Sequence, residues 1–571
     1  MSATDQRVVN INRPPLLEDE AFCAELKQLA SELDIPAETA RAEAESCIEE
    51  LAIEPRDRYL NWSARLARFM YSRSYDPVLD VDREALAKLQ EQAKRRPLVF
   101  LWSHKSHLDS FVFLRAIYDG EFRPQPLSFA GINMAFAGFG TLARNAGAIF
   151  MRRTFKGADI YKLVFRHYVR YLVAQRAPLS WSIEGTRSRT GKLMPPKPGL
   201  MQWVLDALEA NGDDSALFVP VSISFEQIAE MDDYIAINRG QSKRKESLGW
   251  FLGYIFGMQE SAGRIHVRFG DPVSLQDPGE VPAALLQTSA DPKQARTLKL
   301  ALEVSRRIEH STLVTPQSLV CLALLASEGS ALSQEQLQHR LDWLRREVSH
   351  ADLPCAANLE ESLGTGLPGV LNNLAGNGLL QEQDGWRINP AKSLGASYYR
   401  NTISHYFLYA ALGELALADM ADTPGDYRDA IAEAILRWRG VLKFEYVFVG
   451  RETSVHLALA HIDRSYPDWE QLLAQGQSAF GKDEPVFARG ILVSVLEAYR
   501  LFAGNIGEAQ SSDNAPREAL ERAVQLGGPL QSAASLPLME NAQRLFASLQ
   551  ENPDDLQAAL ATALQSLQAA S

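Results

Sequence analysis

The chain has 571 residues, enough for about three or four domains. Its 46% hydrophobic and 23% charged residues are ordinary values for globular proteins, and a net charge of −13 argues against a chain-wide nucleic-acid surface. Four scattered cysteines with no CxxC pair indicate structural thiols in a reducing compartment (Cys23, Cys47, Cys321, Cys355).

Neither a secretory signal nor a simple membrane-spanning helix is expected. The N-terminus lacks a charged region followed by an apolar one, and no uninterrupted run of about 18 apolar residues occurs. The segment from Pro124 to Ala143 is uncharged, but Pro126, Asn133 and its glycines are better explained by turns.

Three regions follow one another along the chain. Residues 1–95 show helical spacing of apolar side chains, and residues 277–571 are rich in Ala, Leu, Glu and Gln with helical periodicity. Residues 96–276 alternate between strand and helix, which predicts a mixed sheet covered by helices. The predicted strands are Leu98–Trp102, Leu127–Ala130, Ala148–Met151, Leu179–Ile183, Leu217–Ser224 and Ile265–Phe269, with helices at Asp159–Gln175 and Leu200–Asn211.

The first predicted strand ends in Ser103-His104-Lys105-Ser106-His107-Leu108-Asp109 and passes directly into a helix. Open α/β sheets place their sites beyond the carboxyl ends of strands, so this turn is a candidate site. A neutral His104 can take a proton from an alcohol, and Asp109 can orient the ring and stabilise the imidazolium. Two alternatives remain open: ordinary surface or core-edge histidines, and a metal site built from His104, His107 and Asp109.

Two downstream segments are candidate phosphate clamps. Gly147 to Arg153 joins an apolar strand to Arg152 and Arg153, and a guanidinium fork matches phosphate oxygens. The second segment follows a strand and carries cations, hydroxyls and glycines; its candidate residues are Glu184, Gly185, Arg187, Arg189 and Lys192.

The second segment is not a P-loop, because five residues separate Gly185 from Gly191 and Leu193 stands where Ser or Thr should bind magnesium. A solvated charged loop is its alternative interpretation. Between Ala137 and Gly199 there are twelve Lys or Arg against two acidic residues, so this part of the chain should attract an anionic substrate, and the same charge suits anionic lipid.

Together with the run around Pro220 (Val219-Pro220-Val221-Ser222-Ile223-Ser224-Phe225), these motifs occur in one order: His-x4-Asp, Gly-x2-Phe-x-Arg-Arg, Glu-Gly-x-Arg-Ser-Arg-x-Gly-Lys and Val-Pro-Val. The chain therefore resembles the glycerophospholipid acyltransferase superfamily. It is most similar to the glycerol-3-phosphate 1-O-acyltransferase branch, which includes dihydroxyacetone-phosphate acyltransferases. The similarity extends from about Pro97 to at least Phe448 and includes Tyr398-Tyr399-Arg400-Asn401 and His405.

The resemblance implies a reaction and roles for residues. His104 would be the general base and Asp109 its partner. Arg152 or Arg153, with Arg187, would hold glycerol 3-phosphate, while Glu184 and Gly185 frame the loop. Pro220 would border the acyl-donor side. The donor would be acyl-CoA or acyl carrier protein as co-substrate, with no cofactor and no metal, and the product lysophosphatidic acid.

A membrane lipid surface is the further expected partner, and nucleic acid is not. The family works at the cytoplasmic face of the inner membrane, which implies a peripheral or monotopic protein. Trp250 to Met258 is too short to span a bilayer but suits shallow insertion, although a buried helix explains it equally well. Alternative functions are a dihydroxyacetone-phosphate or lysophospholipid acyltransferase, a metal-dependent hydrolase, and a non-enzymatic lipid-binding protein.

Overall fold

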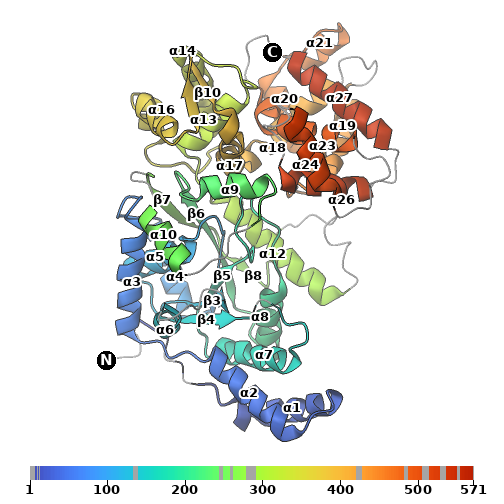
Figure 1. Ribbon diagram of the computed structural model, residues 1–571. Helices are drawn as coiled ribbons and strands as arrows, with labels where there is room; N and C mark the ends of the chain where they lie inside the picture. Colours follow the sequence, from blue (N-terminus) through green and yellow to red (C-terminus); the bar gives the residue numbers. More distant parts are fainter. Residues whose placement is uncertain are drawn as a thin grey trace.

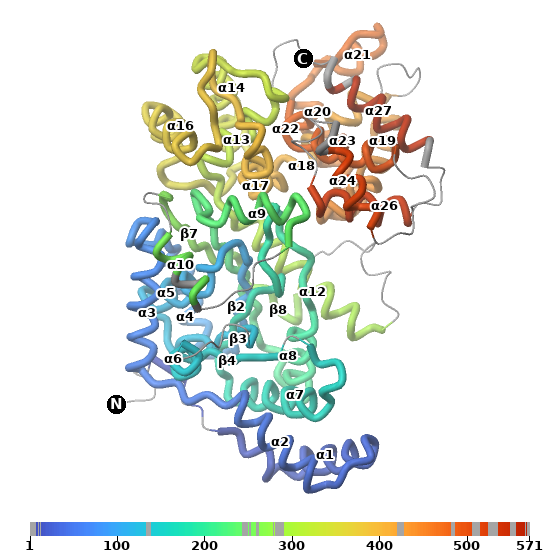
Figure 2. Tube along the Cα trace, in the orientation of Figure 1, coloured from blue at the N-terminus to red at the C-terminus, as the bar shows by residue number. Residues whose placement is uncertain are grey.

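The computed structural model describes residues 7–9, 11, 13–132, 139–152, 154–242, 248–257, 262–277, 279, 291–419, 427–480, 486–504, 514–526, 535–548 and 553–569. The chain starts in helices at one end of the molecule, forms a sheet in the middle and ends in a large helical region at the other end (Figure 1, Figure 2). The N-terminal elements are η2 (Leu16–Glu18), α1 (Glu20–Glu32), α2 (Ala37–Leu51), α3 (Asp57–Tyr71), β1 (Asp80–Val81) and α4 (Arg83–Ala93).

The middle of the chain alternates strands and helices, as the sequence predicts. Its elements are β2 (Leu98–Trp102), α5 (Asp109–Asp119), β3 (Leu127–Gly131), α6 (Phe139–Asn145), β4 (Ala148–Met151), α7 (Asp159–Ala174), β5 (Leu179–Ser182), α8 (Gly199–Ala210), β6 (Leu217–Phe225), α9 (Met231–Asn238), α10 (Leu248–Gly257), β7 (Ile265–Phe269) and β8 (Val273–Ser274). The predicted strands and the α/β fold class are confirmed, because each buried apolar run pairs within one sheet.

The sheet has the strand order β1-β7-β6-β2-β5-β3-β4, with β8 also paired to β6. Five adjacent strands run parallel to one another: β6, β2, β5, β3 and β4. On the other side of β6, strands β7 and β8 run antiparallel to it, so the sheet is mixed. In the register, Trp102 is opposite Ser182 and Val221. The segments that leave β2, β5 and β4 therefore emerge at one edge of the sheet, where parallel α/β sheets carry their sites.

The central strand β2 is buried on both faces. Leu98, Phe100 and Trp102 belong to one apolar core, while Val99 and Leu101 belong to the other. Alternate side chains of a strand point to opposite faces, so the continuous apolar run is the pattern of a strand covered on both sides. The second core includes α1, α2, α7 and α8, and the first extends through α3 and α5 into the C-terminal helices.

The C-terminal region is mainly helical and packs on the carboxyl-edge side of the sheet, above α9 in Figure 1. It also contains a short antiparallel hairpin, β9 with β10, which helical periodicity did not predict. Its elements are α12 (Pro292–His310), α13 (Pro316–Leu325), α14 (Gln334–His350), α15 (Leu359–Leu363), α16 (Leu367–Gly376), β9 (Leu380–Glu382), β10 (Trp386–Ile388), η4 (Pro390–Lys392), α17 (Ser393–Ile403), η5 (Ser404–Tyr406), α18 (Leu408–Asp419), α19 (Tyr427–Val441), α20 (Arg451–Ser465), α21 (Trp469–Ala474), α22 (Phe487–Ile491), α23 (Val493–Ala503), α24 (Ala515–Leu526), α26 (Leu536–Ser548) and α27 (Pro553–Ala569).

Candidate active site

The turn between β2 and α5 brings His104 against Asp109. Nδ1 of His104 lies 2.8 Å from Oδ2 of Asp109. The carboxylate is fully buried, whereas the histidine side chain is 24% exposed. An imidazole whose far side reaches solvent and whose near side contacts a buried carboxylate has the arrangement of a general base with its orienting partner.

Local backbone geometry fixes the carboxylate of Asp109. Its Oδ2 accepts hydrogen bonds from the backbone N–H groups of Lys105 (2.6 Å) and Ser106 (2.8 Å). Asp109 is the first residue of α5, where the helix dipole also favours negative charge. Three donors on one oxygen hold this side chain in a single orientation behind His104.

Glu184 joins the histidine turn to the loop that follows β5. Its two oxygens accept hydrogen bonds from the backbone N–H groups of His104 (2.6 Å) and Met194 (2.8 Å). Burial raises the pKa of this carboxyl, an effect opposed by the ammonium group of Lys105 and by the two backbone donors. Glu184 therefore has a structural role: it is fully buried, and its two oxygens connect the backbone of the histidine turn to the backbone of the loop after β5.

Lys105 is a site residue that sequence analysis did not single out. Its side chain is buried, and Nζ donates a 2.6 Å hydrogen bond to the carbonyl of Gly191. The hydroxyl of Tyr234 in α9 donates to the carbonyl of Lys105 (2.7 Å). Burial lowers the pKa of Lys105, and the nearby carboxylates Glu184 and Asp109 oppose that shift. The signal in the sequence was a lysine within a turn that follows a wholly apolar strand.

Arg187 lies beside the histidine turn, where its guanidinium contacts Nε2 of His107. Burial, followed by the charge of Arg187, lowers the pKa of His107 to about 2, so this imidazole is neutral and accepts from the guanidinium. The ring of His107 packs against Trp250 (4.5 Å between centroids) and Tyr254 (5.3 Å) of α10. His107 therefore holds an arginine near the His104–Asp109 pair, a role that the sequence did not reveal.

Glu230, the residue that precedes α9, supports the same turn. Its Oε1 accepts hydrogen bonds from Oγ of Ser106 and from the N–H of His107, both at 2.8 Å. The side chain is buried, which raises its pKa against the effect of those two donors. Nothing in the local sequence connected Glu230 with a turn more than a hundred residues earlier.

The loop from Gly185 to Lys192 needs its glycines. Gly185 has φ +63°, and a Cβ there would come within 3.0 Å of Lys197; Gly191 has φ +83°, and a Cβ there would lie 2.1 Å from the carbonyl oxygen of Tyr398. Side-chain amides hold the loop backbone, since Asn238 donates to the carbonyl of Arg189 (2.9 Å) and Asn401 to that of Thr190 (2.7 Å). The loop is built into the protein rather than solvated.

Two of the cations predicted to bind substrate, Lys192 and Arg152, have protein carboxylates as partners. Nζ of Lys192 lies 2.5 Å from Glu445, whose side chain is 2% exposed. The guanidinium of Arg152 pairs with Glu50 of α2 (2.6 Å) and packs over the ring of Tyr161. Their charges are therefore neutralised within the protein. The sequence could not reveal this pairing, because the carboxylates lie about 100 or more positions away along the chain.

The remaining predicted residues occupy varied positions. Arg189 is half-buried in the loop, and its guanidinium donates to the carbonyl of Arg187 (3.4 Å). Pro220 is buried in β6 opposite Leu101, one strand away from the histidine turn. Arg153 lies outside the described residues.

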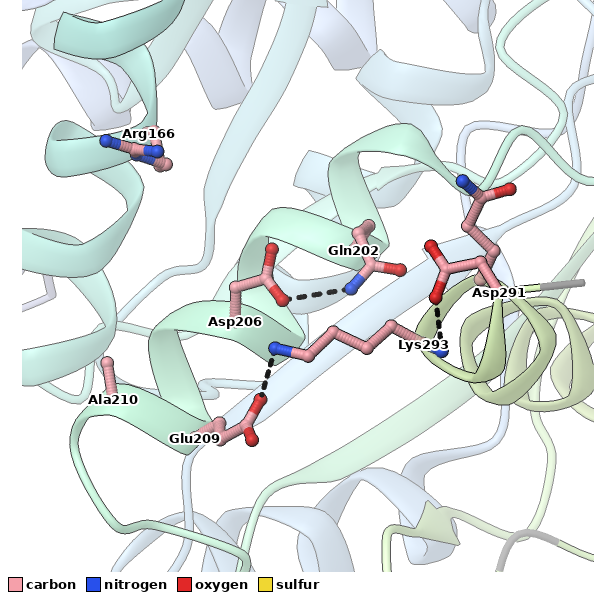
Figure 3. Close-up of a pocket in the computed structure, with 8 residues that line it drawn as sticks. Arg166, Gln202, Asp206, Glu209, Ala210, Asp291 and Lys293 are labelled. Atoms are coloured by element: carbon pink, nitrogen blue, oxygen red, sulfur yellow. Dashed lines mark hydrogen bonds and ion pairs between the residues drawn. The ribbon is translucent and has the colours of Figure 1, made fainter.

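No group of three or more His, Cys, Asp or Glu side chains in the described part of the chain is arranged to hold a metal ion. A surface pocket of about 540 Å³ lies between α8 and α12, and it contains none of the predicted site residues (Figure 3). Its polar groups pair with one another, as Lys293 does with Glu209 (3.2 Å) and Gln202 with Asp206 (3.0 Å). The pocket is separate from the His104 site.

Comparison with known proteins gives the family of this chain. Residues 84–224 match the family model described as Acyltransferase, which covers the histidine turn, the loop after β5 and most of β6. The class of protein is thus an acyltransferase, and an enzyme. Residues 234–531 match the model of the glycerol-3-phosphate acyltransferase C-terminal region, so the chain belongs to the glycerol-3-phosphate acyltransferase family. The family resemblance recognised from the sequence is confirmed.

Individual relatives carry related names. Proteins described as the acyltransferase plsB1, from Mycobacterium tuberculosis and Mycobacterium bovis, are 29% identical over 530 residues, which is 90% of this chain and 83% of theirs. A glycerol-3-phosphate acyltransferase of Glaesserella parasuis is 29% identical over 408 residues, 70% of this chain and 50% of its own length. Among solved structures, the 1-acyl-sn-glycerophosphate acyltransferase PlsC of Thermotoga maritima aligns with 44% of this chain and 78% of its own, at 16% identity and a TM-score of 0.26.

Proposed function

We propose that the protein transfers a fatty acyl group from a thioester to the primary hydroxyl of glycerol 3-phosphate and releases lysophosphatidic acid. The observation that carries this proposal is the partly exposed His104 ring, backed by buried Asp109, with Arg187 held close by through His107. A base and a guanidinium in one place suit an acceptor that has both a hydroxyl and a phosphate.

The reaction follows from these positions. Nε2 of His104 takes the hydroxyl proton while the acceptor oxygen attacks the thioester carbonyl, and Asp109 stabilises the imidazolium that forms. The C–S bond then breaks, the acyl C–O bond remains, and the imidazolium returns its proton to the leaving thiolate. The transfer is direct, with no acyl-enzyme, and uses no cofactor. The phosphate of the acceptor is held by Arg187, with Arg189 next along the loop.

The co-substrate is acyl-CoA or acyl carrier protein, both of which present the same thioester. Dihydroxyacetone phosphate and a lysophospholipid are alternative acceptors, because each has a hydroxyl and a phosphate. The expected location of the protein is the cytoplasmic face of the inner membrane, to which it would bind as a peripheral or monotopic protein. None of the described helices has the length and apolar character required to cross a bilayer.

A metal-dependent hydrolase is the rival enzyme class, in which His104, His107 and Asp109 would be ligands. The contacts favour the acyltransferase, because Nδ1 of His104 is engaged with Asp109 and Nε2 of His107 with Arg187. A non-enzymatic lipid-binding protein would have no need of a base.

The deciding experiment is an acyl-transfer assay with purified protein. It combines labelled glycerol 3-phosphate, dihydroxyacetone phosphate or lysophosphatidic acid with acyl-CoA or acyl carrier protein, with and without a chelator. We expect chelator-insensitive acylation of glycerol 3-phosphate that is lost in His104→Ala. Loss of activity with chelator, or equal damage from His104→Ala and His107→Ala together with chelator sensitivity, favours the hydrolase. Full function of His104→Ala would contradict every enzymatic version of the proposal.

A further inference from the structure

Helix α3 has one face composed of arginines and aromatic side chains. Arg58, Trp62, Arg65, Phe69 and Arg73 recur at intervals of three or four residues, the last just after the helix end, so they lie on one side of it. The opposite side, including Leu60, Ala64, Ala67 and Met70, is buried in the core. Trp62 is 66% exposed and Phe69 is 49% exposed. The arginine–aromatic face is therefore a surface feature on a well-packed helix.

Helix α10 extends this face. Its Phe256 is 59% exposed. Together with Trp62 and Phe69 of α3, it makes up the set of exposed Trp and Phe side chains among the described residues. Arg73 joins the two helices, because Nε donates to the carbonyl of Ile255 (3.2 Å) and the guanidinium lies 5.1 Å from the ring centre of Phe256 and 6.0 Å from that of Phe69. Figures 1 and 2 both show α3 and α10 side by side at one edge of the molecule. We call this surface the α3–α10 face.

The charge of this face is opposite to that of the chain as a whole. Residues 57–73 contain four arginines and one aspartate, whereas the whole protein has a net charge of −13. Arg68 is exposed and lies next to this face, three residues after Arg65. Neither Arg65 nor Arg68 forms an ion pair with a carboxylate in the described part of the chain. This differs from Arg152, Arg166 and Arg428, which pair with Glu50, Glu25 and Asp463. Cations left available beside exposed aromatic rings select an anionic partner with an apolar interior.

We infer that the α3–α10 face is the surface by which this protein docks on a bilayer containing anionic lipid. Trp and Phe side chains bind at the boundary between headgroups and acyl chains, and arginines near them attract anionic headgroups. Nucleic acid fits this face less well, because single strands bind where successive bases stack on rings along a charged groove. The three exposed rings here are divided between two helices. The contact is peripheral: the helices lie on the membrane rather than across it.

The position of the face relative to the site gives the docking a purpose. Trp250 and Tyr254 of α10 contact His107, which in turn holds Arg187. Helix α10 would thus contact lipid through Phe256 and contacts His107, the partner of Arg187, through Trp250 and Tyr254. The docking itself goes beyond the proposed function, since it is measured without substrate.

The test is vesicle flotation of the full chain with phosphatidylcholine alone or mixed with phosphatidylglycerol. We expect binding to the mixed vesicles that weakens about fivefold for each arginine neutralised, or roughly 25-fold for Arg65→Gln/Arg68→Gln. Trp62→Ser/Phe69→Ser should weaken binding about tenfold or more, because it removes apolar area from the interface. All four positions are exposed or at the surface, so these variants should fold with unchanged Tm.

Matched controls are available elsewhere on the chain. Arg346→Gln/Arg517→Gln removes two exposed arginines from α14 and α24, and Leu457→Ser removes an exposed apolar side chain from α20. These variants should bind vesicles like the unmodified protein. All variants should keep full turnover with a water-soluble short-chain thioester, so a failure of the proposed reaction is seen separately from a failure of docking.

Three results would overturn the inference. The first is equal loss of vesicle binding in the control pair and the α3 pair, which would mean a general charge effect. The second is α3-dependent binding of an oligonucleotide with no binding of vesicles. The third is a change in oligomeric state of Trp62→Ser/Phe69→Ser with vesicle binding unchanged, which would assign the face to a second copy of the chain.

Discussion

Two His–Asp pairs in this protein have the same bond and opposite surroundings. In the site, Nδ1 of His104 lies 2.8 Å from Asp109, and at the β1–β7 edge of the sheet Nδ1 of His266 lies 2.7 Å from Asp80. The histidine is 24% exposed and the aspartate fully buried in the first pair, whereas in the second the histidine is 1% exposed and the aspartate 32%. Only the first pair can present its imidazole to a substrate.

The remaining partners of the His266 pair complete the contrast. Nε2 of His266 lies 3.6 Å from Glu226, and Arg268 pairs with Asp80 at 2.7 Å. Both ring nitrogens thus face carboxylates, which favours the protonated imidazolium. A hydrogen-bonded His–Asp pair is therefore a catalytic candidate only when its imidazole is open on the far side.

The largest expected effect separates the two pairs directly. His104→Ala should lower kcat at least about 100-fold, because a positioned general base contributes about 100- to 10,000-fold. His266→Ala should leave kcat within about threefold, since its ring touches neither the site nor solvent. Steady-state kinetics with saturating acceptor and donor, on variants shown by circular dichroism to be folded, measures both.

The opposite result would remove the distinction. A His266→Ala variant that remains folded but loses as much turnover as His104→Ala would mean that exposure does not separate the two roles. Asp109→Asn and Asp80→Asn are the companion variants, and only the former should change the pH dependence of kcat.

The two pairs also differ in how far sequence could predict them. His104 and Asp109 are five positions apart across one strand-to-helix turn, so the local pattern contained both partners and the element that joins them. Asp80 and His266 are 186 positions apart and meet only because the two-residue strand β1 pairs with β7. A strand of two residues has no recognisable hydrophobic pattern, and its register cannot be known before the sheet is assembled.

The same reason explains the outcome for the loop after β5. The motif identified Glu184, Gly185 and Arg187 as a group, but the partners of the loop are distant: Asn238, Asn401 and Glu445. Repeated apolar patterns predicted the strands, because burial on both faces requires them. Which cation would meet a carboxylate and which would face the site depended on helices that sequence analysis described only by composition.

A second prediction concerns another long-range pair, Lys192 with Glu445. Glu445 also accepts hydrogen bonds from Tyr499 and Asn541, both at 3.0 Å, so the C-terminal helices hold the loop. Lys192→Met or Glu445→Gln should each lower the free energy of unfolding by about 3–5 kcal/mol, because each leaves a buried charge or its hydrogen-bond partners uncompensated. Urea unfolding measures the loss, and Lys192→Met/Glu445→Met should recover most of it.

Kinetics distinguish a structural from a substrate-binding lysine in the same variants. If Lys192 holds the loop, Lys192→Met and Glu445→Gln should change the KM for the phosphorylated acceptor alike, by roughly threefold. A much larger rise for Lys192→Met alone would return this lysine to the substrate, as the sequence predicted.

A third prediction tests whether Arg187 holds the acceptor beside the His104–Asp109 pair. Arg187→Ala should raise the KM for the acceptor about 10- to 100-fold with a smaller change in kcat, since it removes a charge-assisted contact. Arg152→Ala is the matched control, because this arginine is already paired with Glu50, and it should raise that KM less than about threefold. Equal effects of the two substitutions would contradict the assignment of the phosphate to Arg187.

The smallest expected effect comes from the His266–Asp80 pair and appears in the pH dependence of the free energy of unfolding. Burial alone would lower the pKa of His266, but its hydrogen bond with Asp80 and the nearby carboxylate of Glu226 outweigh burial and raise the pKa. A raised pKa in the folded state means that the stabilisation is complete below the unfolded value of about 6.5 and is lost as the pH rises through the folded value. Asp80 does not contribute in this range, because the hydrogen bond from His266 holds the pKa of that carboxyl well below its usual value.

The difference in free energy of unfolding between the unmodified protein and His266→Gln should therefore shrink from about pH 6 to pH 9, by about 1.5–3 kcal/mol, the usual contribution of a hydrogen bond to a charged group. Comparing the two proteins cancels the titration of other buried groups, such as Glu309 and Glu497, whose pKa values burial raises to about 7. Urea unfolding at a series of pH values provides the measurement. A difference that stays constant, or grows with pH, would show that His266 is neutral and that the second pair is held by its packing alone.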